Sequence, residues 1–208
     1  MAVTGINRYS RLWDHIANPA EYIVRKGARH QRDLQFTTRP LPVHFRVSAA
    51  LYQVFKELFM ADVYEIDALV KTLPTNPVVI DIGANAGFFD VQLLSKIDRA
   101  TIYAYEPMPA NVETLRQTIR QNPRLQHSIR LFQMAVTGLP LDHLDLFADA
   151  EENSQVVASV FAGFDKSNTQ RIIVPCITLT DIILTNDLPL VDLLKMDCEG
   201  SEYDIIYH

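Results

Sequence analysis

The chain has 208 residues, a formal net charge of −6 and 48% hydrophobic against 21% charged residues. This is the composition of an ordinary globular protein, and it excludes a disordered or collagen-like chain. The negative charge argues against general nucleic-acid binding. No apolar run approaches the roughly 18 residues that cross a bilayer, and residues 1–10 lack the apolar stretch of a secretory signal. We therefore expect a cytoplasmic protein without a transmembrane segment.

Charge is distributed unevenly along the chain. Residues 1–46 carry eight basic and three acidic side chains, a net charge of +5, which leaves −11 on the remainder. A basic arm of this kind can meet a phosphate, an anionic membrane surface or the acidic part of the same chain, and a solvated amphipathic face is more typical than any one of these. The two cysteines, Cys176 and Cys198, are too few for a disulfide framework and are expected to be small buried hydrophobic residues.

The first 77 residues are predicted to be mainly helical, with one extended segment. Apolar spacing predicts a helical region over residues 6–26 that is interrupted at Asn18-Pro19, and two helices over residues 49–73. Between them, residues 34–47 contain two prolines and are typical of an extended or edge strand.

From Val78 onward, strands and helices alternate. Strands are expected at residues 78–83, 101–105 and 129–136, with helices at 87–97 and from Pro109 to Asn122. This order predicts a parallel sheet with right-handed crossovers. Residues 141–177 then predict an antiparallel insertion. A short helix at 180–184, a strand at 191–196 and a helix from Ser201 follow it.

The strongest local signal is a glycine turn after the first of these strands. Gly83 and Gly87 allow a tight turn and a close approach of the backbone to a ligand. Asp81 precedes the turn and can accept hydrogen bonds from a cationic amine. Glu106 follows 25 residues later at the end of the next strand, where an acid can bind both hydroxyls of a ribose. Together these residues predict a nucleoside site at the carboxyl edge of the sheet.

The turn differs from a dinucleotide fingerprint at one position. Asn85 stands where a second glycine would let a pyrophosphate approach. A dinucleotide is therefore disfavoured, and a ligand with a sulfonium and an amino-acid tail suits Asp81 better.

Three strings appear in order along the chain: Val79–Phe89 (VIDIGANAGFF), Tyr105–Pro109 (YEPMP) and Leu194–Glu202 (LKMDCEGSE). Over about residues 50–208 the chain thereby resembles the FkbM family of S-adenosylmethionine-dependent methyltransferases. The resemblance implies an α/β, class I Rossmann-like sheet, for which we expect the order 3-2-1-4. The residue patterns above add an antiparallel insertion and a helical N-terminal extension, and residues 1–46 lie outside the resemblance.

The resemblance also implies a site for S-adenosyl-L-methionine. Its methionine part would lie against the glycine turn, at Asp81, Gly83, Asn85 and Gly87. Glu106 would bind the ribose hydroxyls, Met108 would lie beside the adenine, and Ala135 with Val136 would offer backbone groups to the edge of the base.

Asp197 and Glu199 would face the methyl group and the acceptor as catalytic residues. Many members of the family methylate hydroxyl oxygens of sugars or natural products. A hydroxyl needs a base as the methyl moves in line, and Asp197 is the acid nearest the strand end. A carboxylate that only orients the acceptor would also suffice, since holding the reactants in line supplies much of the rate.

No metal is expected, because Asp197, Glu199 and Glu202 without a histidine are more typical of a helix N-terminus. Lys195 is expected to extend to solvent and Tyr64 to pack in the core.

We therefore expect a basic N-terminal extension over residues 1–48 and a methyltransferase domain over residues 49–208. The usual three further strands are missing, so we expect the domain to be incomplete at its C-terminus and the chain to be a fragment. The expected partner is a small-molecule or glycan acceptor, and no oligomeric state is predicted.

One alternative function is a module that binds the cofactor without turnover, because of the truncated sheet. A less favoured alternative is a nicotinamide-dependent oxidoreductase.

Overall fold

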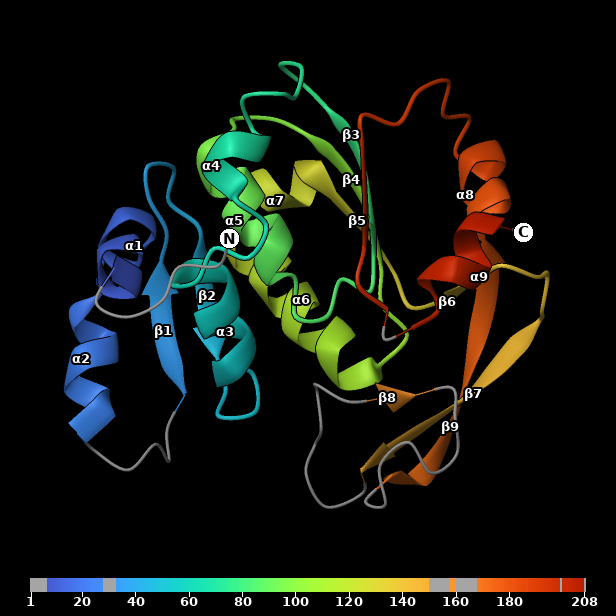
Figure 1. Cartoon of the computed structure of the whole chain (residues 1–208), viewed down its shortest axis with the longest axis horizontal. Helices are drawn as coiled ribbons and strands as arrows, with labels where there is room; N and C mark the ends of the chain where they lie inside the picture. Colours follow the sequence, from blue (N-terminus) through green and yellow to red (C-terminus); the bar gives the residue numbers. More distant parts are fainter. Residues whose placement is uncertain (1–6, 28–32, 150–157, 160–167, 199, 208) are drawn as a thin grey trace.

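The computed structural model describes residues 7–27, 33–149, 158–159, 168–198 and 200–207 (Figure 1). A four-stranded parallel sheet forms its centre. Its strands are β3 (Val78–Ile82), β4 (Thr101–Tyr105), β5 (Ile129–Phe132) and β10 (Leu193–Met196), in the order β10-β3-β4-β5. The predicted order 3-2-1-4 is thereby confirmed.

The central strands are short and apolar because both faces of the sheet are covered, as is usual for parallel strands. Helices α5 (Phe88–Lys96), α6 (Pro109–Gln121) and α7 (Pro123–Ser128) lie on one side, and α8 (Leu179–Thr185) and α9 (Glu202–Tyr207) lie on the other (Figure 1). The first eight residues of α5 are all buried. This helix therefore forms the middle of the core, directly after the glycine turn.

The N-terminal part packs against the same side of the sheet as α5. It consists of α1 (Asn7–His15), α2 (Ala20–Gly27), the antiparallel pair β1 (Leu34–Thr37) and β2 (His44–Val47), α3 (Tyr52–Phe59) and α4 (Ile66–Leu69). Phe45 of β2 contacts both Phe59 of α3 and Phe88 of α5, with ring centroids 5.0 and 5.5 Å apart. Buried residues of α1, α2, β1 and β2 therefore share one hydrophobic cluster with the central sheet.

Two cations of the basic arm form ion pairs within the chain. Arg11 contacts Asp67, with its Nη1 2.9 Å from Oδ2, and Arg46 contacts Asp33. The candidate partners of the basic arm are a phosphate, a membrane surface and the chain itself. Arg11 and Arg46 pair with carboxylates of the chain itself.

A second sheet lies next to the first and contains β6 (Ala135–Thr137), β7 (His143–Asp149), β8 (Ala158–Ser159) and β9 (Asn168–Thr178), in the order β6-β9-β7-β8. The β7–β9 and β7–β8 pairs are antiparallel, as expected for the insertion. The expected single strand over residues 129–136 is wrong. It is interrupted at Gln133-Met134, because β6 leaves the central sheet and pairs in parallel with β9, with Ala135 opposite Cys176. This turn brings Ala135 back over the carboxyl edge of the central sheet.

Among the described helices, none is long and apolar enough to cross a membrane.

Candidate active site

A cavity of about 260 Å³ opens at the carboxyl ends of β3, β4 and β10. Its wall includes the glycine turn, the ends of β4 and β10, β6, and residues from α3 and the α3–α4 loop. Seven of the residues predicted from the sequence line it: Gly83, Asn85, Glu106, Met108, Ala135, Val136 and Asp197. Two other predicted residues, Asp81 and Gly87, are not among the described residues that line the cavity. Glu199 lies outside the residues that the structure describes.

The glycine turn needs glycine for two different reasons. Gly83 and Gly87 have φ values of +74° and +75°, a left-handed conformation that costs other residues energy. A Cβ on Gly83 would lie 2.1 Å from the backbone oxygen of Asp197, so the end of β10 can lie this close to the turn because residue 83 has no side chain. A Cβ on Gly87 would instead lie 2.2 Å from the side chain of Leu115 on α6. Gly83 thus shapes the cavity, whereas Gly87 allows two helices to pack.

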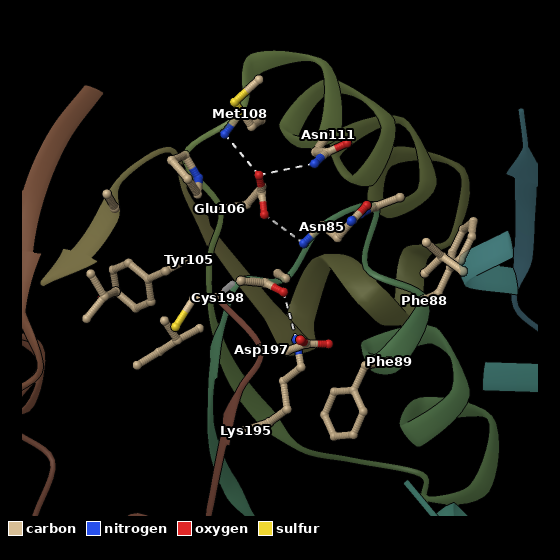
Figure 2. Close-up of a pocket in the computed structure, with 18 of the residues that line it drawn as sticks. Asn85, Phe88, Phe89, Tyr105, Glu106, Met108, Asn111, Lys195, Asp197 and Cys198 are labelled. Carbon is tan, nitrogen blue, oxygen red and sulfur yellow. Dashed lines mark hydrogen bonds between the residues drawn. The ribbon is translucent and has the colours of Figure 1, made fainter. Parts of the chain in front are cut away.

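Glu106 is the most extensively hydrogen-bonded acid of the cavity. Its Oε2 accepts from the backbone N–H of Asn85 at 2.8 Å, and its Oε1 accepts from the backbone N–H of Met108 at 2.9 Å and from Asn111 Nδ2 at 3.2 Å (Figure 2). The side chain is buried. Burial raises the pKa of Glu106, and the three hydrogen bonds oppose that rise. The carboxylate is therefore fixed in one orientation at the edge of the cavity, as predicted for the end of the second strand.

Asp81, which the sequence analysis assigned to the methionine part of the cofactor, lies behind the cavity wall. Its side chain is fully buried, and its Oδ1 lies 2.9 Å from the ammonium of Lys195. The expectation that Lys195 extends to solvent is wrong, because its ammonium donates a second hydrogen bond to the backbone oxygen of Gly83 at 2.7 Å (Figure 2). Residues 81 and 195 are register partners in adjacent parallel strands, so both side chains point to the α5 face. Lys195 thus connects Asp81 to the glycine turn.

Asp90 is a buried acid that the sequence analysis missed. It is fully buried in α5, and among the described residues neither of its carboxyl oxygens accepts a hydrogen bond. Burial and the negative charge of Asp81 raise the pKa of Asp90 well above its usual range, and Lys195 only partly opposes this. The raised pKa favours the neutral, protonated form of Asp90, which can donate its proton to Asp81. The sequence signal of Asp90 is a charged residue between apolar Phe89 and Val91 in a helix that is mostly apolar.

Tyr64 also has a role that its predicted core packing does not explain. Its ring packs edge-on against Phe89, with centroids 5.1 Å apart, while its hydroxyl donates a 2.7 Å hydrogen bond to Asp197 Oδ2. Burial raises the pKa of Tyr64, and the hydrogen bond to Asp197 and the negative charge of Asp197 raise it further. The phenol therefore remains a donor. Residues 64 and 197 are 133 positions apart, so no local pattern could have shown this contact.

Cys198 follows Asp197 in the cavity wall. It is half-buried rather than fully buried, as is Cys176, so the expectation for the two cysteines holds only in part. Burial and the charge of Glu202 raise the pKa of Cys198 to about 12. The thiol is therefore protonated at neutral pH, and it contributes polarisable surface to the cavity rather than a nucleophile.

The family model of the methyltransferase FkbM domain matches residues 81–207, which is more than half of the chain. The chain belongs to this family. The class I, Rossmann-like fold expected from the resemblance is thereby confirmed, and the glycine turn, Glu106 and Asp197 all lie within the matched FkbM region.

The FkbM chain is similar to proteins from fungi and bacteria. It is 25% identical over 177 residues to methyltransferase sdnD of Sordaria araneosa, covering 74% of this chain and 66% of that protein. It is 42% identical over 185 residues to AMB antimetabolite synthetase AmbE of Pseudomonas aeruginosa, covering 74% of this chain and 8% of that protein. It thus spans just under two thirds of the length of the fungal relative.

Among solved structures, methyltransferase FkbM from Methylobacillus flagellatus KT superimposes with a TM-score of 0.42 at 14% identity, covering 75% of this chain and 38% of that chain.

Part of the cavity wall comes from outside the matched FkbM region. Val54, Glu57 and Leu58 of α3, with Val63 and Tyr64 of the following loop, line the cavity and precede residue 81. The site therefore depends on the segment that packs against α5 as well as on the family's own motifs.

Proposed function

We propose that this chain binds S-adenosyl-L-methionine in the cavity and transfers its methyl group to a hydroxyl oxygen of a small-molecule or glycan acceptor. The observation that carries the proposal is the orientation of the Glu106 carboxylate. Two backbone N–H groups and one side-chain amide hold it at the carboxyl edge of a parallel sheet, where ligands of such sheets bind. An acid held there suits the paired hydroxyls of a ribose.

The other cofactor contacts follow from the cavity wall. Met108 and the backbone of Ala135 and Val136 would contact the adenine, and the turn from Gly83 to Asn85 would contact the methionine part. The close approach at Gly83, where a Cβ would collide with Asp197 O, brings the end of β10 against the turn at the cavity wall. Asp81 would act only indirectly, by holding Lys195.

The cofactor would supply a methyl group on a positively charged sulfur. In the transfer, an oxygen lone pair of the acceptor forms the new C–O bond as the C–S bond breaks, which leaves S-adenosylhomocysteine. Asp197 would orient the acceptor hydroxyl and take its proton, with Glu199 as a second predicted acid. The cavity wall would contribute mainly by holding donor and acceptor in line.

Calorimetric titration tests the cofactor assignment. We expect S-adenosylhomocysteine to bind with a Kd on the order of micromolar and NAD not to bind. Glu106→Gln places an amide donor opposite N–H donors, and we expect at least about a tenfold loss of affinity. The matched control is Glu113→Gln on α6, because Glu113 is partly exposed and pairs with Arg116 outside the cavity. Preferential binding of NAD, or equal affinity of the two variants, would contradict the proposal.

Methyl transfer is tested separately. The chain is incubated with S-adenosylmethionine labelled in its methyl group and with a panel of sugars, phenols and hydroxy acids, and labelled ethers are detected by mass spectrometry. Cofactor binding without transfer to any compound of the panel would instead favour a binding module without turnover.

A further inference from the structure

The carboxylate of Asp197 lies between two possible partners. One is the hydroxyl of Tyr64, which donates a 2.7 Å hydrogen bond to its Oδ2. The other is the ammonium of Lys195 (Figure 2), which is close enough for the negative charge of Asp197 to raise its pKa. Within the part of the chain that the structure describes, Asp197 is bonded to the neutral phenol and not to the cation. A carboxylate beside a buried ammonium would ordinarily pair with it, so this choice of partner needs a cause.

Lys195 is held away from Asp197 by other bonds. Its ammonium contacts Asp81 Oδ1 at 2.9 Å and Gly83 O at 2.7 Å, and it lies 5.9 Å from the ring centroid of Phe89. Burial alone would lower the pKa of Lys195, but Asp81 first, and then Asp197 and Asp90, raise it above its ordinary value. Lys195 is therefore charged and already paired, and Asp197 is close enough to be attracted to it.

The position of Tyr64 is fixed by its own loop. Two non-glycine residues on either side of it, Asp62 and Glu65, have left-handed φ values of 50° and 48°. Such backbone persists only where surrounding contacts hold it. Asp62 supplies them, because its buried Oδ1 accepts from the N–H of Ile66 at 3.0 Å and from Gln92 Nε2 of α5 at 3.4 Å. The loop is thereby tied to the helix that follows the glycine turn.

The N-terminal helix supports the same loop. Arg11 of α1 lies 3.6 Å from Asp62 and 2.9 Å from Asp67, and Lys96 of α5 lies 3.0 Å from Asp67. His15 completes this group, with Nε2 3.6 Å from Asp67 Oδ2. His15, Asp62 and Asp67 are close enough together to bind a metal ion, but Arg11 and Lys96 already neutralise the acids. We interpret the group as an ion-pair network that fixes the two ends of the Tyr64 loop.

We propose that Tyr64 is a positioning residue that holds the carboxylate of Asp197 toward the cavity and away from the ammonium of Lys195. The inference rests on the proposed function, because it assigns Asp197 to the side of the cavity where the sulfonium would lie. Held in this way, Asp197 keeps its negative charge directed at the cavity, while the charge of Lys195 is balanced by Asp81.

The test compares the affinities of S-adenosylmethionine and S-adenosylhomocysteine, which differ by the methyl group and its positive charge. It therefore needs no acceptor. Asp197→Asn removes the carboxylate charge, and we expect the affinity ratio of the two ligands to fall about tenfold. Tyr64→Phe removes only the hydroxyl and keeps the ring on Phe89. The released carboxylate turns to Lys195, and we expect the ratio to fall by about threefold or more, with the affinity for S-adenosylhomocysteine unchanged.

Two further variants separate positioning from a structural effect. Tyr52→Phe removes a hydroxyl from a residue of α3 that does not line the cavity, and it should leave the affinity ratio unchanged. The double variant Tyr64→Phe/Asp197→Asn should show the same ratio as Asp197→Asn alone, because Tyr64 acts only through Asp197.

A ratio that is unchanged or higher in Tyr64→Phe would overturn the inference, as would an added loss in the double variant. Failure of the wild type to bind S-adenosylhomocysteine would overturn the proposed function itself, so the two failures are distinguishable.

Discussion

The ammonium of Lys195 and the carboxylate of Asp81 meet 2.9 Å apart, almost fully buried, behind the wall of the cavity. The pKa of the second acid beside this pair, Asp90, is raised by burial and by the charge of Asp81, which favours a neutral acid beside one cation and one anion. This balance is physically required, because an uncompensated charge at such depth would cost several kcal/mol, by order of magnitude. Three predictions concern this cluster and the turn that it supports.

The two acids of the cluster should respond differently to the same substitution. At pH 7 Asp81→Asn leaves the ammonium of Lys195 without its counter-ion, and we expect a loss of about 3 kcal/mol in the free energy of unfolding. Asp90→Asn replaces a protonated acid with a neutral amide that can still donate to Asp81, and at pH 7 it removes the cost of keeping the acid protonated, so the variant should be at least as stable as the wild type. Urea unfolding measures both. Equal losses would show that Asp90 is ionised.

The pH dependence of stability gives a second measure of Asp90. Because folding raises its pKa, the folded state binds more protons than the unfolded state between the two pKa values. The stabilisation by the protonated acid is therefore complete below the ordinary Asp value of about 4, and it is lost as the pH rises toward the raised value. We expect the wild type to lose stability relative to Asp90→Asn over this interval in urea unfolding series. A constant difference between the two proteins would contradict the assignment.

Replacing either glycine of the turn by alanine should lower stability, but only at Gly87 should a second substitution reduce that loss. Alanine at either position is strained by the positive φ, by about 1 kcal/mol. Gly83→Ala also collides with the backbone oxygen of Asp197, which cannot move without displacing β10, so we expect a larger loss of stability and loss of S-adenosylhomocysteine binding.

Gly87→Ala collides only with the Leu115 side chain, which can be shortened. In unfolding experiments the double variant Gly87→Ala/Leu115→Ala should lose less than the sum of the single losses. Gly83→Ala with Leu115→Ala should be additive and serves as the control. Equal coupling in both pairs would show that Leu115 is not the contact that excludes a Cβ at Gly87.

The thiol of Cys198 should be unreactive in the folded protein. Burial and the charge of Glu202 raise its pKa to about 12, so at pH 8 its thiolate fraction is about a thousandfold lower than that of a thiol with its ordinary value. Iodoacetamide at pH 8 should therefore modify Cys198 rapidly in urea and slowly without it, as measured by mass spectrometry of the peptide. Fast modification of the folded chain would mean that the wall of the cavity opens.

Much of the fold could be predicted because local patterns specify it. The strand residues before Gly83, before Glu106 and before Asp197 are short, mainly apolar runs, and this pattern indicated a parallel sheet and the edge where the cavity opens, whereas the sheet order came from the family resemblance. The break at Gln133-Met134 could not be predicted, because residues 129–136 are compatible with one continuous strand. Pairing of β6 with β9, about forty residues later, ends β5 there.

The sequence by itself determined the family, the parallel sheet and the placement of Gly83, Glu106 and Asp197 at one edge, since each follows from residue type and spacing within a short segment. Only the tertiary structure decided which charges meet. It placed Lys195 on Asp81 rather than in solvent, and it brought Tyr64 to Asp197 from the segment before the sheet. The physical reason is that burial and pairing of charges depend on contacts between distant segments, whereas strands, turns and helix starts depend mainly on neighbours in the chain.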